Sequence, residues 1–175
     1  MNLRLRNLEP FSFDHHFMYF FGADALGRSM IARLILATQN TMFIAGSAVI
    51  LSMTLGGVLG LISGYYGGKI GNLIMRMADI IMSFPSLLLA VIVLYMFDPG
   101  LLNLVIVLAF TRMPIYMRTA RAEVLEIRER LFVSAAISMG ASNLRIIFKH
   151  IAPLTIPTLM TIATLDFAFV MLGES

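Results

Sequence analysis

The sequence predicts an all-α, polytopic membrane helix bundle. Its 175 residues are 59% hydrophobic and 13% charged, whereas soluble domains are about 45–50% apolar and about 25% charged. Four stretches are long and apolar enough to cross a hydrocarbon core about 30 Å thick as helices. The spans are predicted to be helical because an open strand in lipid leaves backbone groups unpaired. No amphipathic segments remain to enclose these stretches as core helices of a soluble protein.

The first predicted span carries one small residue at every fourth position. In lipid, helices associate by close approach through such residues, so this stripe predicts an interface with another span or subunit. The stripe consists of Ala48, Ser52, Gly56, Gly60 and Gly64.

The four predicted spans are residues 41–63, 79–97, 101–117 and 154–172.

The later spans contain residues that are unusual inside a membrane helix. Pro85 in the second span and Pro114 in the third are each predicted to kink the helix, because proline removes a backbone hydrogen bond. Asp166 lies inside the fourth span. An intramembrane acid is a functional-site candidate. Alternatively, Asp166 is solvated near the outer interface or hydrogen-bonded to Thr161 or Thr164.

Lysine and arginine predict the orientation. The connections 64–78 and 112–153 are rich in these residues, whereas the connection 98–100 has none. The positive-inside rule therefore places both basic connections in the cytoplasm. Residues 1–40 are then an external N-terminal segment, and residues 41–175 form the transmembrane domain. An external N-terminus without a preceding helix predicts that a span before it is missing, and both ends look cut.

The long cytoplasmic connection, residues 118–153, predicts a helix–Gly–helix unit. Residues 118–139 are expected to form an amphipathic helix, which Gly140 ends. A second, short helix over 143–150 is expected to begin at Ser142 and to be closed by Pro153. The apolar face of the first helix, which consists of Val124, Ile127, Leu131 and Ala135, needs a cover. Either the chain's own helices or a groove on a partner protein could provide it.

This connection resembles the cytoplasmic loop of ABC importer permeases. The family signature is Glu-Ala-Ala, three residues, Gly, nine residues, an apolar residue, any residue, Leu and Pro. The matching residues are Ala135, Ala136, Gly140 and Pro153. At the other positions stand Ser134 for the Glu, His150 for the apolar residue and Ala152 for the Leu. Residues 22–29 and 64–90 also resemble segments of the inner-membrane permeases of dipeptide, oligopeptide and nickel importers.

The resemblance implies a six-span permease core in the bacterial inner membrane, of which about four spans are present. It implies that the loop docks on a cytoplasmic ATPase, that a second permease subunit completes the path and that an external solute-binding protein delivers the substrate. ATP is bound by the partner subunits, so this chain needs no cofactor, and no nucleic acid is expected. The ATPase-coupling residues so implied are Ser134, Ala135, Ala136, Gly140, Ala141, His150 and Pro153.

Several other signals are weaker. Residues 63–70 superficially resemble a P-loop but lack its first Gly and its final Ser or Thr, and they follow a membrane helix. His15 and His16 are too few for a metal site. The chain has no cysteine and no catalytic set at the polar membrane faces, so no enzyme activity is expected.

Two alternative functions remain open from the sequence. One is a truncated, non-transporting remnant or membrane scaffold of the same family, because spans are missing and the Glu and Leu of the loop signature are replaced. The other is a self-contained channel or secondary transporter, which would need intramembrane charge pairs, and only Arg112 and Asp166 are available. The substrate cannot be derived, because peptide and nickel importers share the same loop.

Overall fold

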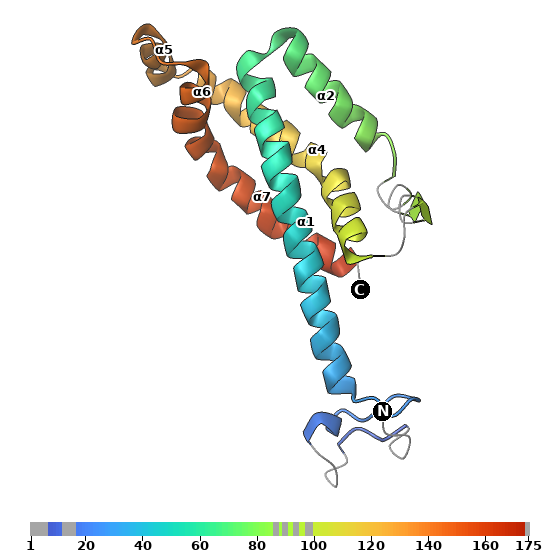
Figure 1. Cartoon of the computed structure of the whole chain (residues 1–175). Coiled ribbons are helices and arrows are strands. Elements are labelled where there is room, and N and C mark those ends of the chain that lie inside the picture. The colour runs from blue at the N-terminus through green and yellow to red at the C-terminus, as the bar shows by residue number, and fades with distance from the viewer. Residues whose placement is uncertain are drawn as a thin grey trace. The chain divides into compact units, whose positions relative to one another are not determined.

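The computed structural model describes residues 7–11, 17–85, 88, 91–92, 95–96 and 100–173. Throughout this part of the chain the regular secondary structure is helical (Figure 1), which confirms the predicted all-α class. The chain divides into two units, Met1–Phe43 and Ile44–Ser175. Helix α1, Met30–Tyr66, begins in the first unit and continues into the second.

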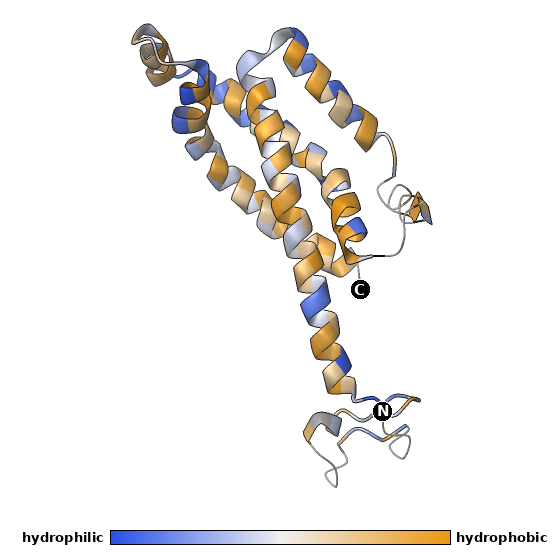
Figure 2. Cartoon of the chain, viewed as in Figure 1, coloured by the Kyte–Doolittle hydropathy of each residue, from blue (hydrophilic) through white to orange (hydrophobic). Residues whose placement is uncertain are grey.

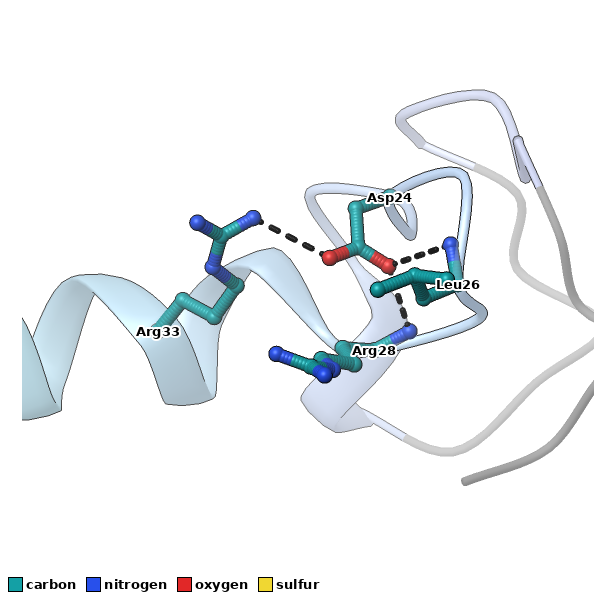
Figure 3. Close-up of polar contacts among 4 residues, drawn as sticks. All are labelled: Asp24, Leu26, Arg28 and Arg33. Carbon is teal, nitrogen blue, oxygen red and sulfur yellow. Dashed lines mark hydrogen bonds and ion pairs between the residues drawn. The ribbon is translucent and has the colours of Figure 1, made fainter.

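The first unit contains a turn built around Asp24 (Figure 3). One carboxylate oxygen, Oδ1, accepts hydrogen bonds from the backbone N–H groups of Leu26 and Arg28, each at 2.9 Å. The other oxygen accepts one from Arg33 Nη1 on α1 at 3.0 Å. Ala23 and Ser29 pair across the same turn. The turn therefore leads directly into α1 and is fixed mainly by one carboxylate.

The hydrogen bond from the Arg28 backbone N–H is the main reason why the pKa of Asp24 lies below its ordinary value; burial opposes it, and Leu26 and Arg33 reinforce it. A lowered carboxyl pKa stabilises the turn above the unfolded pKa, about 3.9, and this contribution is lost as the pH falls through the folded pKa. We expect the Leu26 and Arg28 amides to be protected from hydrogen exchange near neutral pH and to lose protection only when the pH falls below the folded pKa of Asp24, which itself lies under the ordinary value of about 3.9. Unchanged protection at that acidity, measured by NMR, would contradict the role of Asp24.

Helix α1 is longer than the predicted span 41–63. Its 37 residues correspond to about 55 Å, well above the thickness of a hydrocarbon core. It begins after Ser29, whose Oγ accepts a hydrogen bond from the Ala32 backbone N–H at 3.3 Å, as an N-cap residue does. Residues 30–40, predicted as part of an external segment, are thus helical.

Helix α2, Gly68–Met82, lies beside α4 in Figure 1 and shows that residues 68–78 are not a loop. Gly67 and Gly68 have φ values of 60° and 49°, which let the chain reverse between α1 and α2. The helix ends at Met82 because Pro85 disfavours a helical conformation at the residue before it. The rest of the predicted span 79–97 lies largely outside the described residues.

Helix α4, Leu101–Arg128, includes Pro114 and runs without a break past the predicted end of the third span. The predicted separate helix over 118–139 is therefore wrong. The first part of that stretch completes α4, and α5, Leu131–Ser138, follows after an extended Arg130. The break exposes 88% of Leu131 and buries Val133 completely. The packing of Val133 on α4 therefore outweighs the helical spacing that predicted Leu131 and Val124 on one face of a single helix.

The C-terminal part is helical from Asn143 to Gly173. It consists of α6 (Asn143–Arg145), a π-helical stretch, η3 (Ile146–Ile151), and α7 (Ala152–Gly173). Pro153 does not close a helix, contrary to the prediction. It follows the π-helical stretch, in which the Ala152 N–H bonds to Ile147 O, and such a wider turn accommodates a residue that lacks an N–H group. Ser142 stands at the N-cap position but makes no side-chain capping bond.

Within the described residues, three helical stretches are long and apolar enough to cross a membrane: Met30–Tyr66, Leu101–Arg128 and Asn143–Leu172. They contain the first, third and fourth predicted spans. Figure 2 shows that the middles of α1 and α7 are predominantly hydrophobic, whereas hydrophilic residues gather near the α1–α2 turn and near α6. The second unit is therefore a membrane helix bundle with its polar connections at one end.

Candidate functional site

The small-residue stripe of α1 lies against α4. Ala48 packs in a cluster with Val105, and the side chain of Ser52 is fully buried, with its hydroxyl donating a hydrogen bond to Val49 O of the same helix at 3.0 Å. A Cβ placed on Gly56 would lie 2.6 Å from Met113 O, and one placed on Gly64 would lie 2.6 Å from the Val124 Cβ. The structure thus places the five predicted packing residues on one face of α1.

Gly60 is the tightest part of this contact. A Cβ there would lie 2.6 Å both from the Ala120 Cβ and from Met117 O. Neither atom belongs to a flexible side chain that could move aside. Close approach of the two backbones therefore requires glycine at this position.

At the polar end of the bundle, one apolar cluster joins α1, α4, α5, η3 and the start of α7. The cluster is buried and includes residues from each of these elements: Leu61, Val124, Ile127, Val133, Ala136, Ile146, Ile147, Ile151 and Ala152. Tyr65 packs against the same cluster, and its hydroxyl donates a hydrogen bond to Asn143 Oδ1 at 3.0 Å. The connection after α4 is therefore tied to the end of α1.

Two arginines of α4 cap the turn between α1 and α2. Arg128 Nη1 donates a hydrogen bond to Tyr65 O at 3.0 Å. Arg121 Nη1 donates to Gly71 O at 3.0 Å and to Ser63 Oγ at 3.3 Å. From the sequence these arginines predicted only the orientation of the chain, although basic groups near helix C-termini commonly satisfy free carbonyls.

Gly140 ends α5 in a Schellman motif. Its φ is +77°, its N–H donates to Ile137 O at 2.9 Å, and the Ala141 N–H donates to Ala136 O at 3.1 Å. This left-handed conformation is nearly free for glycine and unfavourable for other residues. A Cβ at Gly140 would meet no atom within 4 Å, so the requirement for glycine within this chain is conformational.

The predicted coupling residues are divided between a buried side and an exposed side. Ala136 is buried, Ala141 and His150 are partly buried, and the exposed ones are Ser134, Ala135, Gly140 and Pro153. A hollow of about 280 Å³ lies beside Gly140. Three of its lining residues, Arg145, Lys149 and His150, are basic. Ser134, Ala135 and Pro153 do not line it.

The same connection exposes large apolar side chains. They are Leu131, Phe132, Ile137, Met139, Leu144 and Phe148, and Met139 is 81% exposed. Exposed apolar residues grouped beside a basic hollow are typical of a protein interaction site. We refer to these six exposed side chains, with the hollow, as the loop surface.

A second polar site lies between α4 and α7. Asp166 is 5% exposed, its Oδ2 accepts a hydrogen bond from the Tyr116 hydroxyl at 3.1 Å, and Arg112 Nη1 lies 3.4 Å from its Oδ1. The Thr161 and Thr164 hydroxyls donate to backbone carbonyls instead. Asp166 is therefore neither solvated nor bound to these threonines.

Within the described residues, no group of three or more His, Cys, Asp or Glu side chains could hold a metal ion. His15 and His16 lie outside those residues.

Comparison with known proteins gives consistent matches. A family model described as "Binding-protein-dependent transport system inner membrane component" matches residues 56–175. The dipeptide transport system permease protein of Alkalihalophilus pseudofirmus is 38% identical over 154 residues, which cover 88% of this chain and 51% of that protein. The nickel transport system permease protein of Escherichia coli K12 is 35% identical over 154 residues, covering 88% and 56%.

The oligopeptide transport system permease protein of Bacillus subtilis is 32% identical over 167 residues, which cover 95% of this chain and 53% of that protein. The chain thus spans about half the length of the curated relatives that it matches.

Proposed function

The chain belongs to the family of binding-protein-dependent transport system inner membrane components, and we propose that it is a permease subunit of an ATP-binding-cassette importer for peptides or nickel. The family membership confirms the predicted resemblance and the multi-pass inner-membrane location. In the proposed role, the membrane helices line part of the path and carry out no covalent chemistry. ATP binds to partner subunits.

The observation that carries the proposal is the loop surface. Its exposed apolar residues, of which Leu131 and Met139 are the most exposed, lie on both sides of Gly140, which ends α5 in a defined conformation. A cytoplasmic ATPase with an apolar groove and acidic residues at its rim would bury them and pair with Arg145 and Lys149.

The buried cluster beneath the loop surface supports a coupling role. Val133 and Ala136 of α5 pack on Val124 and Ile127 of α4, and Tyr65 links α1 to Asn143. A force applied to α5 therefore reaches α1, α4 and α7 through packed side chains. In this proposal a second permease subunit completes the path, and an external solute-binding protein delivers the substrate.

Replacement of Gly140 tests the proposal. Gly140→Val should reduce co-purification of the ATP-binding subunits of a co-expressed dipeptide importer by about tenfold, because a β-branched residue disfavours the left-handed conformation by at least 1–2 kcal/mol. Gly140→Asn should retain most of the binding, because asparagine tolerates this conformation.

Thermal unfolding of both variants separates this effect from global unfolding, since the bundle should remain folded. Full retention of the ATPase by Gly140→Val would argue against docking through this loop. If the unchanged chain binds no ATPase under conditions in which an importer permease does, the non-transporting scaffold becomes the better interpretation.

A further inference from the structure

Arg112 is a cation inside α4, one of the helices that are long and apolar enough to cross a membrane. A charged side chain within such a helix is costly, and such residues commonly mark sites for ions or substrates. The small-residue contact between α1 and α4 does not explain its presence.

An open pocket of about 320 Å³ lies beside Arg112. One wall comes from the end of α2 and the turn after it, and the other comes from α4 on either side of Arg112. The first wall consists of Ile81, Met82, Phe84 and Pro85, and the second includes Thr111 and Ile115. Thr111 and Arg112 are its polar side chains, and the Thr111 hydroxyl already donates to Leu108 O at 2.9 Å. Small-molecule sites commonly have such apolar walls and few polar groups.

Asp166 neutralises Arg112 only in part. The ion pair is a single contact of 3.4 Å, longer than the 2.7–2.9 Å typical of a charge-assisted hydrogen bond, and the second carboxylate oxygen is occupied by Tyr116. Among the described residues, the side-chain N–H groups of Arg112 make this ion pair and donate no hydrogen bond. The side chain is 32% exposed, and a guanidinium offers a planar fork of donors that fits a second carboxylate.

We propose that this pocket binds a carboxylate attached to an apolar group, such as the C-terminus of a short peptide that ends in an apolar residue. The remaining N–H groups of Arg112 bind the carboxylate, and the walls around Phe84 and Ile115 bury the apolar group. Asp166 orients the guanidinium from the opposite side. That the ligand is a transported peptide rests on the proposed function, whereas the binding chemistry rests on the pocket alone.

The test uses the full chain in lipid nanodiscs, without an ATPase. The probes are N-acetyl-leucine and N-acetyl-leucinamide, which differ chiefly in the carboxylate, and their binding is measured by the shift of the thermal unfolding midpoint with concentration. We expect the acid to bind about tenfold or more tightly than the amide. Arg112→Gln should abolish this preference, and Asp166→Asn should strengthen binding of the acid several-fold, because the guanidinium is then freed.

Arg118→Gln is the matched control, because Arg118 also lies on α4 but is exposed and pairs with Asp79; binding should not change. Equal binding of acid and amide by the unchanged chain would overturn the site, whether or not the variants fold. An unaltered preference in Arg112→Gln, or no strengthening in folded Asp166→Asn, would also overturn it. If the chain retains an ATPase but does not prefer the acid, only this site fails. If it prefers the acid but binds no ATPase, only the proposed function fails.

Discussion

Replacing Gly60 with leucine is expected to separate α1 from α4 and to prevent the second unit from folding stably. Any side chain at this position starts from a Cβ that lies 2.6 Å from Met117 O and from the Ala120 Cβ. Both atoms are fixed by the α4 backbone, so the helices must move apart. The contacts along the rest of the stripe, such as that of Gly56 with Met113, would then be lost together.

A pair of alanine substitutions gives the quantitative form of this prediction. Gly60→Ala should lower the free energy of unfolding by about 1–3 kcal/mol through overpacking, although alanine favours a helix by about 1 kcal/mol over glycine. Gly46→Ala is the control on the same helix, because its Cβ would lie 3.9 Å from Phe167, an ordinary contact. Gly46→Ala should therefore be neutral or stabilising.

Denaturant titration in mixed micelles, followed by circular dichroism, measures both variants. Equal effects at Gly60 and Gly46 would mean that close approach to α4 does not determine the requirement for glycine.

The stripe illustrates how much of the bundle could be predicted. A period of four small residues identifies the face of α1 that packs, because the period follows from helix geometry. It cannot identify the partner. That partner is α4, whose matching Ala120 and Met117 lie about 60 residues further along the chain and show no such period.

The connection over residues 118–153 was predicted less well. Val124, Ile127, Leu131 and Ala135 have helical spacing, so a single helix was a reasonable interpretation. In the structure the chain leaves the helix at Arg130, and Val133 and Ala136 enter the cluster that also contains Leu61 of α1. Local helical periodicity favours one helix, whereas packing against a residue about 70 positions away in the sequence favours a break. A local pattern does not show the second effect.

Of the two residues predicted to end helices in this connection, only the glycine does so, because only its effect is local. Gly140 was correctly expected to end a helix, because its left-handed conformation is a local property. Pro153 was incorrectly expected to close one. The π-helical stretch before it, Ile146–Ile151, gives the room that a proline needs, and this stretch has no simple signature in the sequence.

Asp166→Ala is expected to lower the free energy of unfolding by about 3–5 kcal/mol, because it leaves Arg112 without its ion-pair partner inside a membrane-spanning helix. It also removes the acceptor of the Tyr116 hydroxyl hydrogen bond. The pair Arg112→Met and Asp166→Leu, made together, should recover most of this loss, because apolar residues of similar size avoid the cost of burying charge. The effects of the two substitutions on the free energy of unfolding should therefore be strongly non-additive.

A double-variant cycle measures that coupling from denaturant titrations of the single and combined variants. The control is the ion pair of Arg118 with Asp79, in which both side chains are more than half exposed. Its coupling should not exceed about 1 kcal/mol. Additive effects at Arg112 and Asp166 would mean that the two charges do not depend on each other for stability. Strong coupling would mean that the chain keeps a partly buried charge pair, although an apolar pair at these positions would make the fold more stable. Retention of such a pair is expected if Arg112 binds a ligand.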